Sequence, residues 1–156
     1  MKESIRTGIS FGLTSGVITT LGLMVGLHSG THSKLAVVGG ILTIAIADAF
    51  SDALGIHISE EAENAHTDTQ IWAATFATFI SKFFFSLTFL IPVFFFEMGV
   101  AIFVSIAWGL FILAFFSYRM ARIQKNSPVA VVSEHILIAV LVIAATHFAG
   151  NLISRF

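Results

Sequence analysis

The feature that most constrains this chain is a run of 48 residues, Ile71 to Tyr118, in which Lys82 and Glu97 are the only charged side chains. A helix needs about 20 mostly apolar residues to cross the roughly 30 Å hydrocarbon core of a bilayer. The run is therefore long enough for two spans, and Pro92 with the break at 97–99 marks the expected hairpin between them. These lengths predict an integral membrane protein.

Three further apolar stretches complete an expected all-α fold with five transmembrane helices in a single domain over residues 1–156. The expected spans are 5–27, 35–58, 71–96, 98–118 and 129–153. The composition agrees, because 56% of the residues are hydrophobic and 11% are charged, whereas soluble domains carry about a quarter charged residues. A soluble enzyme and a disordered chain are thereby excluded.

The distribution of Lys and Arg predicts the orientation. Short cytoplasmic loops are enriched in these residues, and an N-terminus inside places five of them on the cytoplasmic side and two outside. We therefore expect the N-terminus in and the C-terminus out. The inner residues are Lys2, Arg6, Arg119, Arg122 and Lys125, and the outer ones are Lys34 and Arg155.

Several classes of partner and chemistry find no support in the sequence. A net charge of −1 without a basic cluster argues against nucleic acid as a partner. The absence of Cys excludes thiolate ligands and nucleophiles. No nucleophile motif, phosphate-binding glycine loop or zinc-protease motif is present, so we expect no enzyme and no permanently bound cofactor.

Small residues recur along the first expected helix at alternating spacings of four and three. Such a seam lets another helix approach closely in lipid. We leave two interpretations open, a homodimer interface and internal packing against a helix of the same chain. The seam comprises Gly8, Gly12, Ser15, Thr19, Gly22 and Gly26, and Gly16 adds a second overlapping G-x-x-x-G step.

Two acids lie inside the second expected helix. Asp48 and Asp52 are four residues apart and share one helix face, which Ser51 helps to extend toward the cytoplasm. A carboxylate at the middle of a membrane costs about 2.5–3.5 kcal/mol on insertion scales and generally marks a functional site. The pair is the first candidate for a cation site.

An acidic segment follows these two residues at the inner end of the same helix. Glu60, Glu63 and His66 lie in it, and the spacing of Glu63 and His66 predicts that both share a helical face. Oxygen and imidazole donors without thiolate suit Fe²⁺, Mn²⁺ or similar cations. The alternative is a solvated helix end.

Lys82 offers a structural alternative for one acid. It lies about 11 residues into the third span and Asp48 about 10 residues from the inner end of the second, so at 1.5 Å per residue the two have similar depths. An Asp48–Lys82 ion pair could then serve only to neutralise two buried charges. One lysine neutralises one acid, so we do not expect this pair to account for Asp52, whose own alternative is to reach the inner interface.

Residues along most of the chain resemble the vacuolar iron transporter family and its prokaryotic relatives. The matching positions are 16–23 and 26–27 in the first helix, then 39–40, 47–51, Gly55, Ser59 and Glu63 in the second, followed by Pro92 and 147–150. The resemblance implies a dimeric five-helix protein that moves Fe²⁺ or Mn²⁺ out of the cytosol in exchange for protons. It also implies that first helices meet near a central metal path.

The chain departs from the family pattern at its ligand positions. The usual acid before the first-helix glycine is Ser15, the second-helix carboxylate position is Ile44, and Asp52 replaces a methionine. The long acidic insert of the family is reduced to residues 59–69. The acids thus lie at Asp48 and Asp52, and exchanging a thioether for a carboxylate makes the site harder.

Together these features predict a homodimeric transporter of Fe²⁺ or Mn²⁺ that exports the metal against protons, in a prokaryotic plasma membrane. Its expected ligands are Asp48, Asp52, Glu60, Glu63 and His66, and Ser15, Ser51 and Lys82 are expected along the path. The alternative is a membrane assembly or binding module that keeps the fold without transporting, with Asp48–Lys82 as a structural pair.

Overall fold

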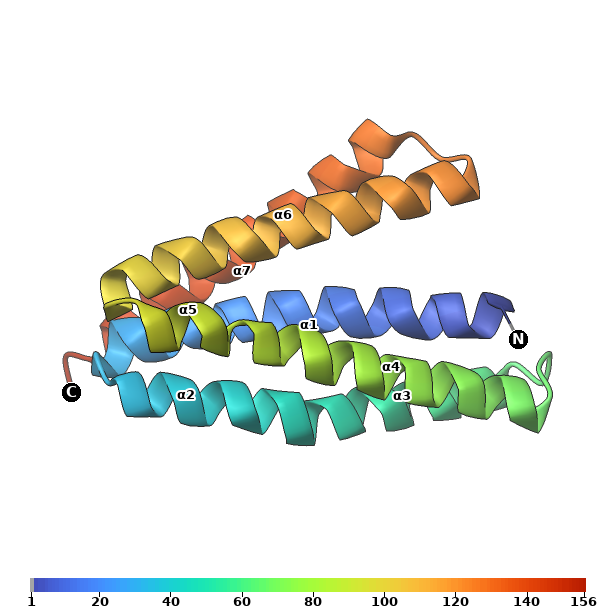
Figure 1. The fold of residues 1–156 in the computed structure, drawn as a ribbon, viewed down its shortest axis with the longest axis horizontal. Coiled ribbons are helices and arrows are strands. Elements are labelled where there is room, and N and C mark those ends of the chain that lie inside the picture. Colours follow the sequence, from blue (N-terminus) through green and yellow to red (C-terminus); the bar gives the residue numbers. More distant parts are fainter. Residues whose placement is uncertain (1) are drawn as a thin grey trace.

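A computed structural model describes residues 2–156 as an all-helical bundle with its termini at opposite ends (Figure 1). Five helical segments are long and apolar enough to cross a membrane, which confirms the predicted all-α, five-span architecture. Their bounds are Lys2–Thr31, Lys34–Ala62, Asp68–Phe95, Met98–Gln124 and Pro128–Ile153. Each extends one to six residues beyond the predicted apolar core at one or both ends, except that the third ends at Phe95, one residue short.

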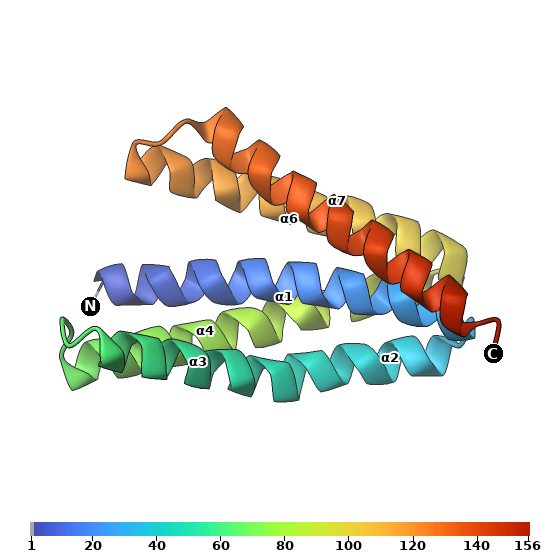
Figure 2. The ribbon, with the colours of Figure 1, turned by 180° about the vertical axis from the view of Figure 1, so that it is seen from behind.

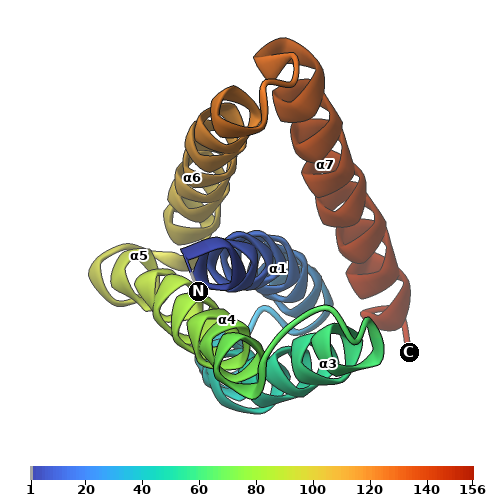
Figure 3. The same cartoon turned by 90° about the vertical axis from the view of Figure 1, so that its right-hand side faces the viewer.

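Helix α1 (Lys2–Thr31) is the central element of the bundle. It contacts helices from all four other spans, and Figure 3 shows it enclosed by them when the bundle is viewed along its length. Its core side chains include Leu13, Val17, Leu21 and Met24, each no more than 1% exposed. The outer helices therefore pack around an apolar axis that α1 supplies.

The second span is a helix interrupted at its middle by a π-helical turn. It comprises α2 (Lys34–Thr43), η1 (Ile44–Asp48) and α3 (Ala49–Ala62). At the end of the turn the Ala49 N–H donates to the carbonyl of Ile44, five residues earlier. Such π turns are rare and often lie at functional sites, and this one ends at Asp48.

The third span bends near its C-terminal end, where α4 (Asp68–Thr88) gives way to the short α5 (Leu90–Phe95). Pro92 lacks the N–H that would bond to the carbonyl of Thr88, so the α-helix breaks one turn before the proline. The predicted break at 97–99 agrees with the hairpin at its first residue, whereas Pro92 precedes the hairpin and lies inside α5. The hairpin is formed by Phe96 and Glu97, whose backbones are extended.

Helices α6 (Met98–Gln124) and α7 (Pro128–Ile153) form an antiparallel pair that diverges from α1 toward the end where the N-terminus lies (Figures 1 and 2). Lys125, with a φ of 59°, ends α6, and Ser127 caps α7 by accepting from the Ala130 N–H. Large apolar side chains point outward, such as Phe103, which is 75% exposed. This outer surface is typical of contact with lipid.

The glycine seam of α1 packs against helices of the same chain. A methyl group on Gly8 or Gly12 would overlap carbonyl oxygens of α4, and one on Gly16 would lie 3.2 Å from the Lys82 Cα. Farther along, Gly22 and Gly26 face α7. This is the internal-packing interpretation, and the assignment of these five glycines to a homodimer interface is corrected, because their faces are already covered.

Candidate functional site

Lys82 lies at the centre of a polar cluster inside the bundle. Its side chain is 0% exposed, and its ammonium Nζ lies 2.5 Å from Asp48 Oδ2. The ammonium also donates to Asp52 Oδ2 at 2.6 Å and to Ser15 Oγ at 2.9 Å. We call Ser15, Asp48, Asp52 and Lys82 the Lys82 centre. The Asp48–Lys82 contact predicted from helix depth is confirmed.

The expectation that Lys82 could not also account for Asp52 was wrong. An ammonium group carries three N–H donors, and here it donates to Asp52 and Ser15 and also forms an ion pair with Asp48. Counting charges alone misses this arrangement, because one lysine can contact both acids even though it neutralises only one. The centre therefore carries a formal charge of −1 when both carboxylates are ionised.

Close helix packing places the lysine there. Because residue 16 of α1 has no side chain, the backbone of α4 approaches it at Lys82, and the neighbouring Ser15 then supplies a hydroxyl to the ammonium. On the opposite side, Ala49 and Ala53 of α3 are buried and bring that helix close to α4. Small residues on two helices thus let one long side chain reach three oxygen ligands.

The two carboxylates are less enclosed than the lysine that they contact. The Asp48 side chain is 37% exposed and that of Asp52 19%, and Ser51 beside them is exposed on the outer face of α3. Among residues 2–156, no three His, Cys, Asp or Glu side chains lie close enough together to hold a metal ion. The centre offers carboxylate and hydroxyl oxygens arranged around an ammonium.

The acidic segment at the end of α3 folds differently from its prediction. The helix ends at Ala62, and Asn64 takes a left-handed conformation with a φ of 51°. Glu63 and His66 therefore do not share a helical face, and the predicted i, i+3 pair is wrong. His66 instead turns back so that its Nδ1 lies 3.0 Å from Oε2 of Glu60, a residue that is 8% exposed.

This segment is separate from the Lys82 centre. Glu60 follows Asp52 by eight residues on one helix, which corresponds to about 12 Å at 1.5 Å per residue. Glu63 is exposed to the surroundings at the helix end. The five expected metal ligands thus form two groups, Asp48 with Asp52 and Glu60 with His66, and Glu63 stands apart from both.

Three histidines hold neighbouring helices together. The His147 ring connects α7 to α1, with Nδ1 2.6 Å from Ser29 Oγ and Nε2 3.0 Å from Asn151 Nδ2. His57 of α3 lies 3.0 Å from the Thr75 hydroxyl of α4. His135 is placed in the same way 2.7 Å from the hydroxyl of Ser117. These contacts satisfy polar groups between helices.

The fold and the site define a polytopic α-helical membrane protein with a charged cluster enclosed between its first three spans. No protein-family model, no curated protein and no solved structure matches the chain significantly. The resemblance to the vacuolar iron transporter family accordingly remains an expectation from the residues quoted above.

Proposed function

We propose that this protein is a divalent-cation transporter that carries Fe²⁺ or Mn²⁺ out of the cytoplasm in exchange for protons, with the Lys82 centre as its cation site. One observation carries the proposal. A fully buried ammonium on the third span lies against two carboxylates of the second span and a hydroxyl of the first, next to a π turn in the middle of the second.

The oxygens around Lys82 form a set that a metal cation could use in its place. Carboxylate and hydroxyl oxygens are hard ligands, which suit Mn²⁺ and Fe²⁺ better than soft cations. Asp48 and Asp52 are partly exposed whereas Lys82 is fully buried, so a cation could approach the carboxylates without passing the ammonium. Water molecules would complete its coordination.

Exchange follows from the charges of the centre. With Lys82 protonated, the two aspartates and the ammonium sum to −1. A divalent cation held by both carboxylates would take the oxygens that now contact the ammonium. Protons delivered to the same carboxylates from the other side of the membrane would release the metal and return charge in the exchange. The metal cation and the proton thus exclude each other at one site, which is the requirement for their exchange.

An open stripe of small residues on the second span supports a homodimer. Gly39, Thr43, Ala47, Ser51 and Gly55 are spaced by four and are all exposed, and methyl groups on Gly39 and Gly55 would meet no atom within 4 Å. Such a stripe allows close helix approach in lipid. A second copy there would also cover the exposed part of Asp48, which is costly to leave against hydrocarbon.

The Glu60–His66 pair supports a collecting role at the helix end that we expect to face the cytoplasm. A carboxylate and an imidazole 3.0 Å apart can bind a divalent cation weakly and pass it on. Glu63, exposed directly after the end of the same helix, adds negative charge to this entrance. We place the protein in a prokaryotic plasma membrane, as the sequence suggests.

Metal flux in proteoliposomes under an imposed pH gradient tests the proposal. Fe²⁺, Mn²⁺, Co²⁺, Zn²⁺ and Mg²⁺ are offered in turn to the wild type and to Asp52→Asn, which keeps the size of the side chain and one acceptor for Lys82. Arg155→Gln, at the far end of the chain, is the control. We expect selective flux that Asp52→Asn abolishes and Arg155→Gln preserves. Wild-type flux by Asp52→Asn would exclude this path.

A single-cysteine experiment tests the dimer, because the chain has no native Cys. Cysteine at Ser51 should cross-link between copies, whereas cysteine at Phe84, which is 59% exposed on α4, should not. Equal cross-linking at both positions would indicate random collision. Cross-linking at neither position would contradict a homodimer interface along this stripe.

The direct Asp48–Lys82 contact equally favours the second candidate, a non-transporting assembly or binding module in which this pair is structural. A charge swap distinguishes the two. Asp48→Lys combined with Lys82→Asp should regain expression and stability relative to either single variant if the pair is structural. A cation site should recover no flux from the same double variant.

A further inference from the structure

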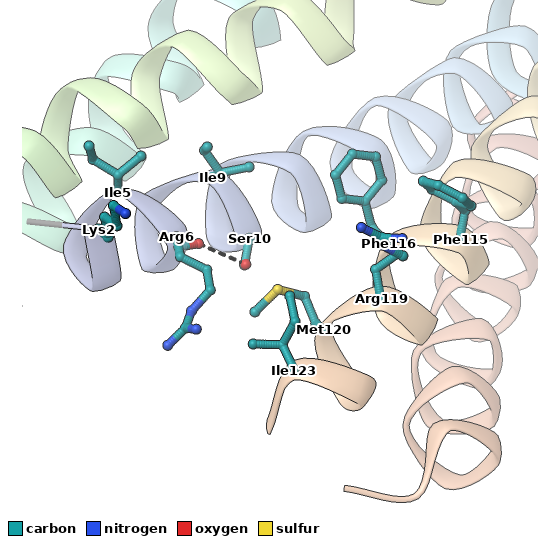
Figure 4. Close-up of a pocket in the computed structure, with 10 residues that line it drawn as sticks. All are labelled: Lys2, Ile5, Arg6, Ile9, Ser10, Phe115, Phe116, Arg119, Met120 and Ile123. Atoms are coloured by element: carbon teal, nitrogen blue, oxygen red, sulfur yellow. Dashed lines mark hydrogen bonds between the residues drawn. The ribbon is translucent and has the colours of Figure 1, made fainter. Parts of the chain in front are cut away.

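A groove lies between the start of α1 and the end of α6, where these two helices diverge (Figure 4). Its volume is about 550 Å³, and its apolar lining includes Ile9, Phe116 and Met120. The hydroxyl of Ser10 does not make the floor polar, because it donates to the carbonyl of Arg6 at 2.8 Å. The interior can therefore accept hydrocarbon.

Cationic side chains also line the groove. Lys2 and Arg6 come from α1, and Arg119 comes from α6 (Figure 4). Arg119 also lines an adjoining hollow with Arg122. Because these residues occupy the ends of membrane-spanning helices, they lie at the depth of lipid headgroups.

One acidic residue faces this cluster. Glu3 lies 3.7 Å from Arg6, but the Glu3 side chain is 81% exposed and that of Arg6 41%. A contact of this kind between exposed groups contributes little. The groove thus combines an apolar interior with an excess of positive charge at its edge.

We propose that this groove binds an anionic phospholipid, with an acyl chain against Ile9 and Phe116 and the phosphate between Arg6 and Arg119. Basic pockets between transmembrane helices at this depth suit anionic headgroups. A helix of another protein with an uncharged face would fill the apolar part but would leave the cations unpaired. The bound lipid fills the space between α1 and α6 where these two helices diverge. This inference does not depend on cation transport.

Native mass spectrometry of the detergent-solubilised protein tests the proposal with two lipids that have identical acyl chains, phosphatidylglycerol and phosphatidylcholine. We expect phosphatidylglycerol to bind more tightly. Each cation near an anionic headgroup is worth about fivefold in affinity, so Arg6→Gln and Arg119→Gln should each lower the preference about fivefold. Arg119→Lys should retain most of it.

Two matched variants and a soluble anion complete the design. Arg155→Gln, at the opposite end of the chain, should leave the lipid preference unchanged, and Glu3→Gln should raise it by removing the acidic neighbour of Arg6. Inorganic phosphate at the same concentration should not displace the lipid, because it lacks the acyl chain. Equal binding of the two lipids, an equal loss in Arg155→Gln, or displacement by phosphate would each overturn the proposal.

Discussion

Replacing Lys82 by methionine should destabilise the protein more than any single change to its acidic partners. Methionine keeps the length and apolar stem of the side chain but removes the ammonium. Asp48 and Asp52 would then face each other without the cation that now contacts both. By contrast, Asp48→Asn leaves Lys82 balanced by Asp52 and should cost about 1 kcal/mol, the usual value of one hydrogen bond.

The geometry of the centre sets the size of the effect. Lys82 Nζ lies 2.5 Å and 2.6 Å from the two carboxylate oxygens, so these oxygens are at most about 5 Å apart. Two unit charges at that distance repel by about 3 kcal/mol at an effective dielectric constant near 20. Loss of one partner of a buried pair typically costs about 3–5 kcal/mol. We therefore expect about 3 kcal/mol for Lys82→Met.

The decisive variant combines Lys82→Met with Asp48→Asn. One carboxylate then remains, the repulsion disappears, and the double variant should be more stable than Lys82→Met alone by about 2–3 kcal/mol. Unfolding by SDS titration in mixed micelles, followed by the fluorescence of Trp72 and Trp108, measures all four members of the cycle. Additive effects, or a cost below about 1 kcal/mol for Lys82→Met, would refute the reasoning.

Three further predictions concern packing and topology. Gly12→Ala should destabilise the protein by about 1–3 kcal/mol, because its methyl group would overlap a carbonyl oxygen of α4. Gly99→Ala is the control: its methyl group would meet no atom within 4 Å, so the variant should unfold like the wild type in the same SDS titration. Asn64→Ala should cost about 1–2 kcal/mol because of its left-handed backbone, and Asn64→Gly should not, again by SDS titration. Single cysteines at Ser33 and Ser127 should react with an impermeant reagent from opposite sides of the membrane, Ser33→Cys from outside and Ser127→Cys from inside. Labelling of Ser127→Cys in intact cells would contradict the predicted orientation.

The architecture could be predicted because it depends on the lengths of apolar runs. Membrane thickness imposes those lengths, and antiparallel helices of known rise bring Asp48 and Lys82 to one depth without any knowledge of packing. The π turn at Ile44–Asp48 had no such signal, since its first four residues are as apolar as their neighbours and only Asp48 at its end differs.

The errors at the site have separate causes. The pairing of Glu63 with His66 assumed a helix that continues through Asn64, but that residue takes a left-handed backbone and the chain turns back. The glycine seam of α1 correctly predicted close approach but not which helix approaches. Spacing alone describes one face of one helix, and α4 and α7 rather than a second copy cover the faces of these glycines.

The glycine seam of α1 and the Lys82 centre depend on the same close packing between α1 and α4. A buried lysine in a membrane needs acceptors for three donors, and a single neighbouring helix can offer few of them. Because Gly16 admits the backbone of α4, the Lys82 side chain begins at the axis of the bundle, within reach of Ser15 on one side and α3 on the other. Any bulky residue at position 16 would move the ammonium away from all its oxygens together. The small residues of α1 thus determine where Lys82 and its two acids meet inside the bundle, and the cation of the proposed function would compete there with Lys82.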